Sequence, residues 1–142
     1  MAISYDDVVN AQKTQDSVIR KTSLTFSDTF TKITGSMVYL KNEFEQKTGS
    51  FKLRGAYYKI KTLSEEEKRN GVVAASAGNH AQGVAFASAL EKIKCVIVMP
   101  KNASPAKVAA TKAYGATVVL AGKNYDESWI KAQGIAKTTG AT

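Results

Sequence analysis

Three short apolar runs, each followed by a helical pattern, constrain the fold of this chain more than any other feature. The runs lie at residues 72–75, 95–99 and 116–120, and none of them alternates between apolar and polar residues. Unbroken apolar strands are typical of a parallel sheet whose two faces are both covered. The sequence therefore predicts an α/β fold, with an open parallel sheet and helices on both faces.

Helix boundaries between these runs are marked by capping patterns. Ser64 followed by Glu67 is a capping box, and Asn124 followed by Glu127 is a related pattern. Ser104 is a candidate N-cap because Pro105 follows it at the first helical position. We expect helices at about 5–15, 51–63, 65–70, 80–91, 105–114 and 125–137, a further strand at 36–41, and a loop at 45–50. Residues 16–35 show no clear pattern.

The last three residues repeat an earlier pattern. Gly140-Ala141-Thr142 follows a predicted helix, just as Gly115-Ala116-Thr117 follows one and opens a strand. We therefore expect another strand to begin at the end of the chain, and we interpret the sequence as a piece of a longer protein.

Composition argues against several classes of function. The net charge is +8, from 20 basic and 12 acidic residues. The lysines are scattered, without a basic block or interleaved aromatic residues, so neither a nucleic acid nor a membrane is the expected partner. No apolar run reaches membrane-spanning length, and the first ten residues do not resemble a signal peptide. A single cysteine, Cys95, in an apolar run suggests a reducing, cytoplasmic setting.

A lysine between two glycines is the first candidate for chemistry. Lys52 stands between Gly49 and Gly55, at the expected start of a helix. A helix N-terminus offers unpaired N–H groups that suit an anion. A lysine amine there can attack a carbonyl carbon and form a Schiff base. A solvated surface lysine is the alternative interpretation.

The loop at residues 76–79 is the second candidate. It follows the strand at 72–75, and ligands of open parallel sheets bind at the carboxyl ends of strands. Ser76 and Asn79 can donate and accept hydrogen bonds, and turn N–H groups can hold a carboxylate. An ordinary capped turn is the alternative. His80, the only histidine, can line the site, but no cluster of histidine and cysteine residues points to a metal.

Together these segments resemble the threonine dehydratase (threonine ammonia-lyase) branch of the fold-type II pyridoxal-phosphate enzymes. Residues 46–56 look like the cofactor-lysine segment of that family, and residues 76–83 look like its substrate-carboxylate loop. Residues 98–100 and 107–116 are similar to its following strands and helix. The resemblance covers residues 18–142. It implies that residues 51–142 form the small domain, which ends before its last strand. Residues 1–50 would belong partly to a large domain.

The resemblance also implies a role for each matching residue. Lys52 would hold pyridoxal 5'-phosphate as a Schiff base and later move the α-proton of the substrate. Phe51 would lie against the cofactor ring, and Asn79 would hydrogen-bond its 3-hydroxyl group. The residues around the substrate carboxylate would be Ser76, Ala77, Gly78, Asn79 and His80. Related serine racemases carry a serine at position 77 as a second base, so Ala77 favours elimination over racemisation.

Some family features are changed or absent. A proline is usual at position 23, where this chain has serine, and asparagine followed by an apolar residue is usual at positions 44 and 45. The glycine-rich phosphate loop of the family, and the residue that faces its pyridine nitrogen, would lie beyond residue 142.

The expected parent protein is a homo-oligomeric lyase that deaminates L-threonine or L-serine to a 2-oxo acid and ammonia. We expect the isolated chain to bind the cofactor weakly and to turn over little or nothing. The alternatives are a racemase or a β-replacing synthase of the same fold type, or a non-catalytic binding module.

Overall fold

A parallel three-stranded sheet forms the centre of the larger body. In the computed structural model, which describes residues 3–142, the strands are β3 (Val72–Ala75), β4 (Cys95–Met99) and β5 (Thr117–Leu120). Their order is β3-β4-β5, with Val72 opposite Cys95 and Val96 opposite Thr117. The α/β fold and the parallel sheet predicted from the sequence are confirmed; β5 begins one residue later than expected.

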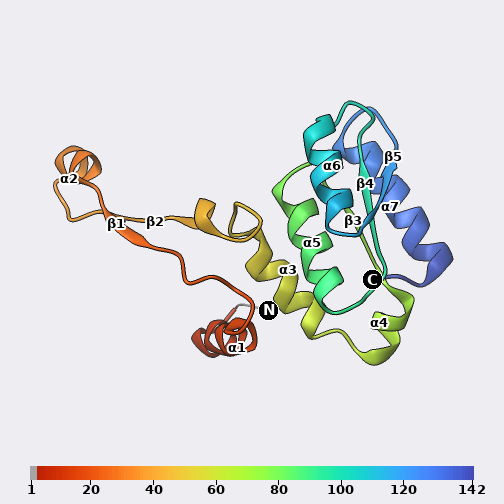
Figure 1. Cartoon of the computed structure of the whole chain (residues 1–142), viewed down its shortest axis with the longest axis horizontal. Helices are drawn as coiled ribbons and strands as arrows, with labels where there is room; N and C mark the ends of the chain where they lie inside the picture. The colour runs from red at the N-terminus through yellow and green to blue at the C-terminus, as the bar shows by residue number, and fades with distance from the viewer. Residues whose placement is uncertain (1–2) are drawn as a thin grey trace.

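Helices cover both faces of this sheet (Figure 1). The α5 helix connects β3 to β4, α6 connects β4 to β5, and α7 follows β5. The α5 helix packs on one face of β3 and β4, against α3, while α7 packs on the other face. The bounds are α3 (Lys52–Lys61), α4 (Glu65–Asn70), α5 (Asn79–Leu90), α6 (Pro105–Ala113) and α7 (Tyr125–Thr139).

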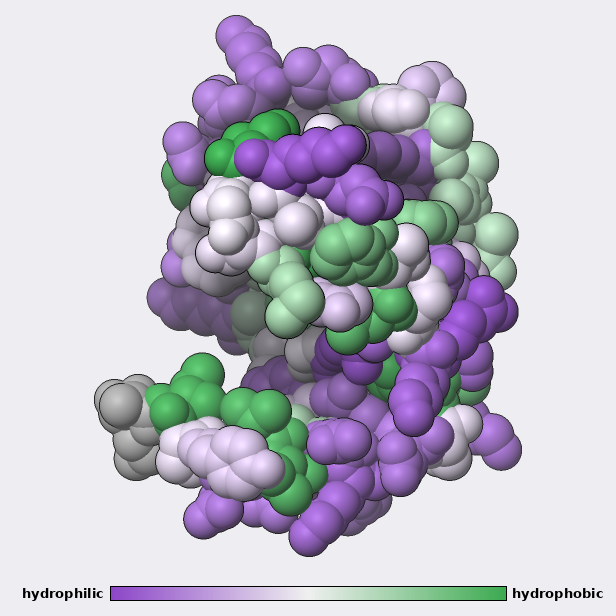
Figure 2. All heavy atoms as spheres, turned by 90° about the vertical axis from the view of Figure 1, so that its left-hand side faces the viewer, coloured by the Kyte–Doolittle hydropathy of each residue, from purple (hydrophilic) through white to green (hydrophobic). Residues whose placement is uncertain are grey.

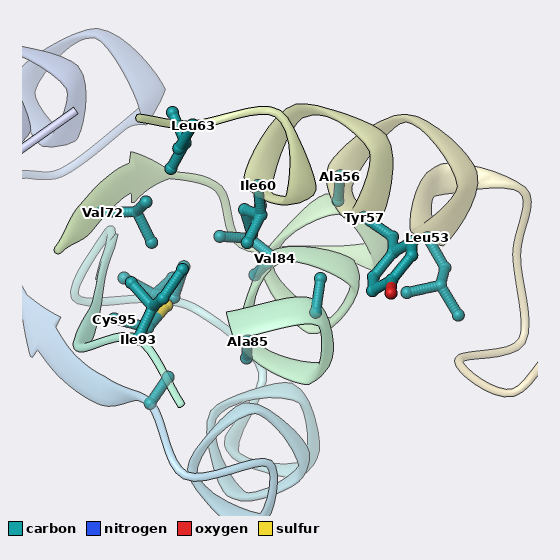
Figure 3. Close-up of a cluster of buried hydrophobic side chains, with 14 of the residues drawn as sticks. Leu53, Ala56, Tyr57, Ile60, Leu63, Val72, Val84, Ala85, Ile93 and Cys95 are labelled. Carbon is teal, nitrogen blue, oxygen red and sulfur yellow. The ribbon is translucent and has the colours of Figure 1, made fainter. Parts of the chain in front are cut away.

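The main hydrophobic core lies between α3, α5 and the sheet. Leu53, Tyr57 and Ile60 recur at helical spacing on α3 and are buried against α5, as Figure 3 shows. Alternate residues of β4 serve the two faces, because side chains of a strand alternate: Ile97 belongs to the main core and Val98 to the cluster under α7. Each buried aliphatic side chain contributes about 1.5–3 kcal/mol, so this packing fixes α3 relative to α5.

The capping patterns are confirmed at two helices and wrong in detail at a third. Ser64 and Glu67 form both hydrogen bonds of a capping box, and the Asn124 side chain accepts the N–H of Glu127. The Ser104 side chain makes no cap bond. The reason is local, because the Lys107 N–H that it would accept donates to the Ser104 carbonyl at 3.0 Å.

An arm projects from this body (Figure 1), and the sequence patterns did not predict most of it. It consists of β1 (Leu24–Phe26), α2 (Asp28–Thr34) and β2 (Tyr39–Lys41), with β1 antiparallel to β2. The strand expected at 36–41 is therefore shorter, and its partner and α2 had not been expected. Every residue of both strands is exposed. Figure 2 shows exposed apolar residues scattered among hydrophilic ones on this side of the molecule.

The arm joins the body through a short 3-10 helix, η1 (Glu43–Glu45), which leads toward α3. The N-terminal helix α1 (Tyr5–Gln15) has the bounds that the sequence indicated. It lies against α3, where the Gln15 side-chain amide donates to the Arg54 carbonyl at 3.0 Å. Within residues 3–142, no helix is long and apolar enough to cross a membrane.

The last residue of the chain lies beside the outer edge of β3. Gly140 ends α7 in the left-handed conformation, with φ of 72°. The Thr142 N–H then donates to the Gly71 carbonyl at 3.0 Å, and the Val73 N–H donates to the Thr142 carbonyl at 2.8 Å. These are the two bonds with which one residue joins a parallel ladder.

Candidate functional site

The N-termini of α3 and α5 meet beside a small pocket. Gly83 of α5 lies so close to α3 that a Cβ added there would stand 3.2 Å from the Lys52 carbonyl carbon and from the Leu53 nitrogen. Because α5 has no side chain at this point, its first turn comes next to the first turn of α3. The shared pocket has a volume of about 240 Å³ and is lined by Phe51, Lys52, Gly55, Ala56 and His80.

Lys52 presents an accessible amine in this pocket. Its side chain is exposed, and its Nζ lies 5.1 Å from the centre of the Phe51 ring. None of the ion pairs among residues 3–142 includes Lys52. Phe51 is 57% exposed, so much of its surface is accessible beside the amine. An amine without an acidic partner, next to a flat apolar surface, suits the capture of an aromatic aldehyde.

The loop between β3 and α5 is held by its own serine. The Ser76 Oγ accepts the N–H groups of Gly78 and Ala81, at 3.3 and 3.2 Å. The Ser76 N–H donates to the Val98 carbonyl at 3.0 Å, which ties the loop to the sheet. Ser76 therefore shapes the loop as well as lining it.

The backbone N–H groups that remain unpaired in this region indicate a binding site for an anion. Gly78 is the N-cap of α5 and supplies no side-chain acceptor. In the described part of the chain, no hydrogen bond uses the backbone N–H of Asn79 or of His80. Such unpaired donors at a helix N-terminus, together with the helix dipole, favour a bound carboxylate or phosphate.

His80 is held toward its neutral form. The imidazole is exposed on one side, but the surrounding protein buries enough of it to lower its pKa, and the positive charge of Lys52 lowers it further. A neutral imidazole adds no charge to the pocket and can still accept a hydrogen bond.

The structure brings together the residues that the sequence selected. Phe51, Lys52 and His80 share the pocket, and Asn79 is the first residue of α5 beside His80. Ala77 and Gly78 belong to the same loop, between Ser76 and the helix.

Sequence reasoning did not select Lys107. Its Nζ would be 3.7 Å from a Cβ added to Gly78, so the ammonium group lies over the loop. A lysine in the first turn of a helix that has no acidic residue there was the available signal.

A buried hydroxyl in the segment before α3 lacks a partner. Thr48 is 6% exposed, and its Oγ1 is the one buried side-chain polar atom without a hydrogen bond among the described residues. Burying an unpaired hydroxyl costs about 1–3 kcal/mol. Thr48 precedes the lysine by four residues and does not line the pocket at Lys52.

A larger groove lies elsewhere. Its volume is about 1150 Å³, and it runs between α1, the segment at 19–21 and the outer side of α3 around Arg54 and Tyr58. The hollow below the arm in Figure 2 is on this side of the molecule. The groove contains neither Lys52 nor the loop at 76–80. By size alone this groove would be the candidate functional site. The accessible amine and the unpaired N–H donors, however, lie at the smaller pocket.

Known proteins resemble this chain over nearly its whole length. It is 50% identical over 139 residues to an L-threonine ammonia-lyase of Thermotoga maritima, which covers 98% of this chain and 35% of that protein. The structure of maize serine racemase matches with a TM-score of 0.92 and 32% identity, over 100% of this chain and 43% of the racemase. Threonine deaminase isoform 2 of Solanum lycopersicum matches with a TM-score of 0.85 and 35% identity, over 100% and 40%.

This chain therefore spans well under half the length of these relatives. The family model for pyridoxal-phosphate dependent enzymes matches residues 16–142, which is most of the chain. The expected resemblance is confirmed at the level of the family: the chain belongs to the pyridoxal-phosphate dependent enzymes.

Proposed function

We propose that this chain is the lysine-bearing part of an ammonia-lyase that deaminates L-threonine, and L-serine, to a 2-oxo acid and ammonia. One observation carries the proposal. The accessible Lys52 amine, the Phe51 ring and His80 line a single pocket, and the unpaired N–H groups of Asn79 and His80 lie at the adjoining N-terminus of α5. The name of the Thermotoga maritima relative supports threonine as the substrate.

Pyridoxal phosphate, when bound, supplies an electron sink that allows the α-proton of an amino acid to leave. The residues of this chain would hold and orient the reactants. Lys52 Nζ would hold the cofactor covalently and, once the amino group of the substrate has displaced it as a free amine, would take the α-proton. Phe51 would cover one face of the ring, and the Asn79 side chain would hydrogen-bond the ring hydroxyl. Unpaired N–H groups at Asn79 and His80 would bind the substrate carboxylate.

The residues around Lys52 fit pyridoxal phosphate by their chemistry. An amine without an acidic partner and an exposed aromatic side chain suit an aromatic aldehyde.

The domain division of the parent protein is a separate inference. We infer that residues 51–142 form the small domain of the parent. Residues 1–50, whose arm is exposed on both strands, would belong partly to a large domain. We further propose a homo-oligomeric, cytoplasmic parent.

A racemase is the second candidate, because the maize serine racemase structure is so similar. Racemisation by two bases needs a proton-accepting side chain on the face of the substrate opposite Lys52. By its resemblance to the family, position 77 would provide that side chain, and Ala77 has no group that can accept a proton. This residue supports elimination over racemisation.

Covalent trapping tests the role of Lys52. The purified chain is incubated with pyridoxal phosphate, reduced with borohydride and mapped by peptide mass spectrometry. We expect the label on Lys52 in preference to the other lysines, and its loss in Lys52→Ala. The matched control is Lys59→Ala, an exposed lysine of the same helix. Labelling spread evenly over the surface lysines would contradict the proposal.

Turnover by the chain alone is expected to be little or none, since it spans a minority of the length of its relatives. The assay follows 2-oxobutanoate formed from L-threonine. Full deaminase activity of the 142-residue chain would show that the site needs nothing beyond these residues.

A further inference from the structure

Lys107 is placed where the proposed substrate carboxylate would bind. Its ammonium nitrogen lies over Gly78, 3.7 Å from the position of an added Cβ. Gly78 is the N-cap of α5, directly before the unpaired N–H groups of Asn79 and His80. A full positive charge and two backbone donors thus face the same end of one helix.

The position of Lys107 in its own helix is unfavourable for α6. It is the third residue of α6, and a positive charge in a first turn opposes the helix dipole. Four other helices, α1, α2, α4 and α7, carry acidic residues in the first turn. The helices without any are α3, α5 and α6, which contribute Lys52, the loop and Lys107 to this region.

No acidic side chain among the described residues pairs with Lys107. It is exposed, and none of the ion pairs among residues 3–142 includes it. An unneutralised ammonium beside unpaired N–H groups favours an anion over a neutral ligand.

We propose that Lys107 is a substrate-binding residue that pairs with the α-carboxylate of the amino acid at the α5 N-terminus. This inference rests on the proposed function and adds a residue from a different helix to its site. Lys107 would raise the affinity for the free amino acid without taking part in proton transfer. The ligand it selects is an anionic amino acid, in preference to the corresponding amide.

The test measures carboxylate binding directly and needs neither cofactor nor turnover. L-Threonine is titrated into the isotope-labelled 142-residue chain, and the amide resonances of Asn79 and His80 are followed by NMR. L-Threoninamide, which lacks the carboxylate, is the comparison ligand. We expect saturable shifts with L-threonine only, and a dissociation constant about three- to five-fold higher in Lys107→Gln, the size expected for an exposed charge pair.

Two variants separate charge from structure. Lys107→Arg keeps the charge, so we expect its affinity to stay within about two-fold of the unsubstituted chain. Lys112→Gln removes an exposed lysine from the same helix and is expected to change nothing. Equal affinities in Lys107→Gln and Lys112→Gln would overturn the proposal, and so would the absence of saturable shifts in the unsubstituted chain.

The outcome is independent of the proposed lyase function. Labelling of Lys52 by pyridoxal phosphate with no effect of Lys107→Gln on threonine binding would sink this inference alone. The converse, with loss of affinity in Lys107→Gln but no preference for Lys52 in labelling, would sink the lyase proposal and leave the carboxylate site standing.

Discussion

Gly83 lies against the first turn of α3, where a Cβ added to it would stand 3.2 Å from the carbonyl carbon of Lys52. The neighbouring atoms belong to the backbone, which cannot rotate aside as a side chain can. The position of the α5 N-terminus relative to the lysine therefore depends on the absence of a side chain at residue 83.

Gly83→Ala is expected to destabilise the chain by about 1–3 kcal/mol, the usual effect of overpacking. The two helices would move apart at the pocket, so labelling of Lys52 by pyridoxal phosphate should also slow. Urea unfolding followed by circular dichroism measures the first effect, and timed borohydride trapping measures the second.

Gly134→Ala is the matched control for this substitution. Gly134 is also a helical glycine, in α7, and a Cβ there would meet nothing within 4 Å. Alanine should therefore stabilise the chain, by up to about 1 kcal/mol, through its helix propensity. If both substitutions stabilised the chain equally, the close contact at Gly83 would not be a constraint.

His80 should report on the charge of Lys52. Burial and then Lys52 lower the pKa of this imidazole. In Lys52→Ala we expect the pKa to move up toward 6.5, because one of the two causes is gone. NMR titration measures it without ambiguity, since the chain has a single histidine. Lys112→Ala, on α6, should leave the pKa in place, and an unchanged value in Lys52→Ala would remove the electrostatic link.

Much of the body of this protein could be predicted because local and tertiary signals agree there. The strand at 72–75, its neighbour at 95–99 and the Ser64–Glu67 capping box have the bounds and bonds that the pattern indicated. Buried strands must be apolar and helix ends must satisfy their N–H groups, so both leave marks in the sequence.

The arm could not be predicted for the opposite reason. All six residues of β1 and β2 are exposed, so no burial pattern distinguishes them from a loop. Leu24, Phe26 and Tyr39 are apolar but belong to no core cluster of this chain. Lys107 was missed because its position over Gly78 depends on how α6 packs against α5, which lies outside any local pattern.

Gly71, directly before β3, is expected to tolerate substitution poorly. Its φ is 87° and its ψ is −173°, a region that glycine alone occupies readily, and an added Cβ would stand 2.8 Å from the Lys94 carbonyl oxygen. Gly71→Ala should lower the free energy of unfolding by about 3 kcal/mol or more, from strain and clash together.

Gly115→Ala isolates the clash from the strain. Gly115 also has a positive φ, of 89°, but an added Cβ would meet nothing within 4 Å. Its substitution should cost about 1–2 kcal/mol, for the backbone alone. Thermal unfolding of the two variants side by side gives the difference; equal losses would mean that the Lys94 contact relaxes without cost.

Glu43 should make the attachment of the arm sensitive to acid. The Arg54 guanidinium donates to both carboxylate oxygens of Glu43, through Nε at 2.8 Å and Nη2 at 2.6 Å, and the Thr22 hydroxyl donates at 2.7 Å. These groups, Arg54 first, hold the pKa of Glu43 below its ordinary value of 4.5. Because the folded pKa is lowered, this contribution to stability is complete above pH 4.5 and is lost as the pH falls through the folded pKa.

Glu43→Gln should therefore destabilise the chain by about 1–3 kcal/mol at neutral pH, and the difference from the unsubstituted chain should shrink as the pH falls below 4.5. Urea unfolding at a series of pH values measures this. Glu66→Gln, at an exposed position of α4, should show a small difference at every pH. A Glu43→Gln difference that stayed constant from neutral to acid pH would mean that the Glu43–Arg54 pair does not stabilise the junction between the arm and α3.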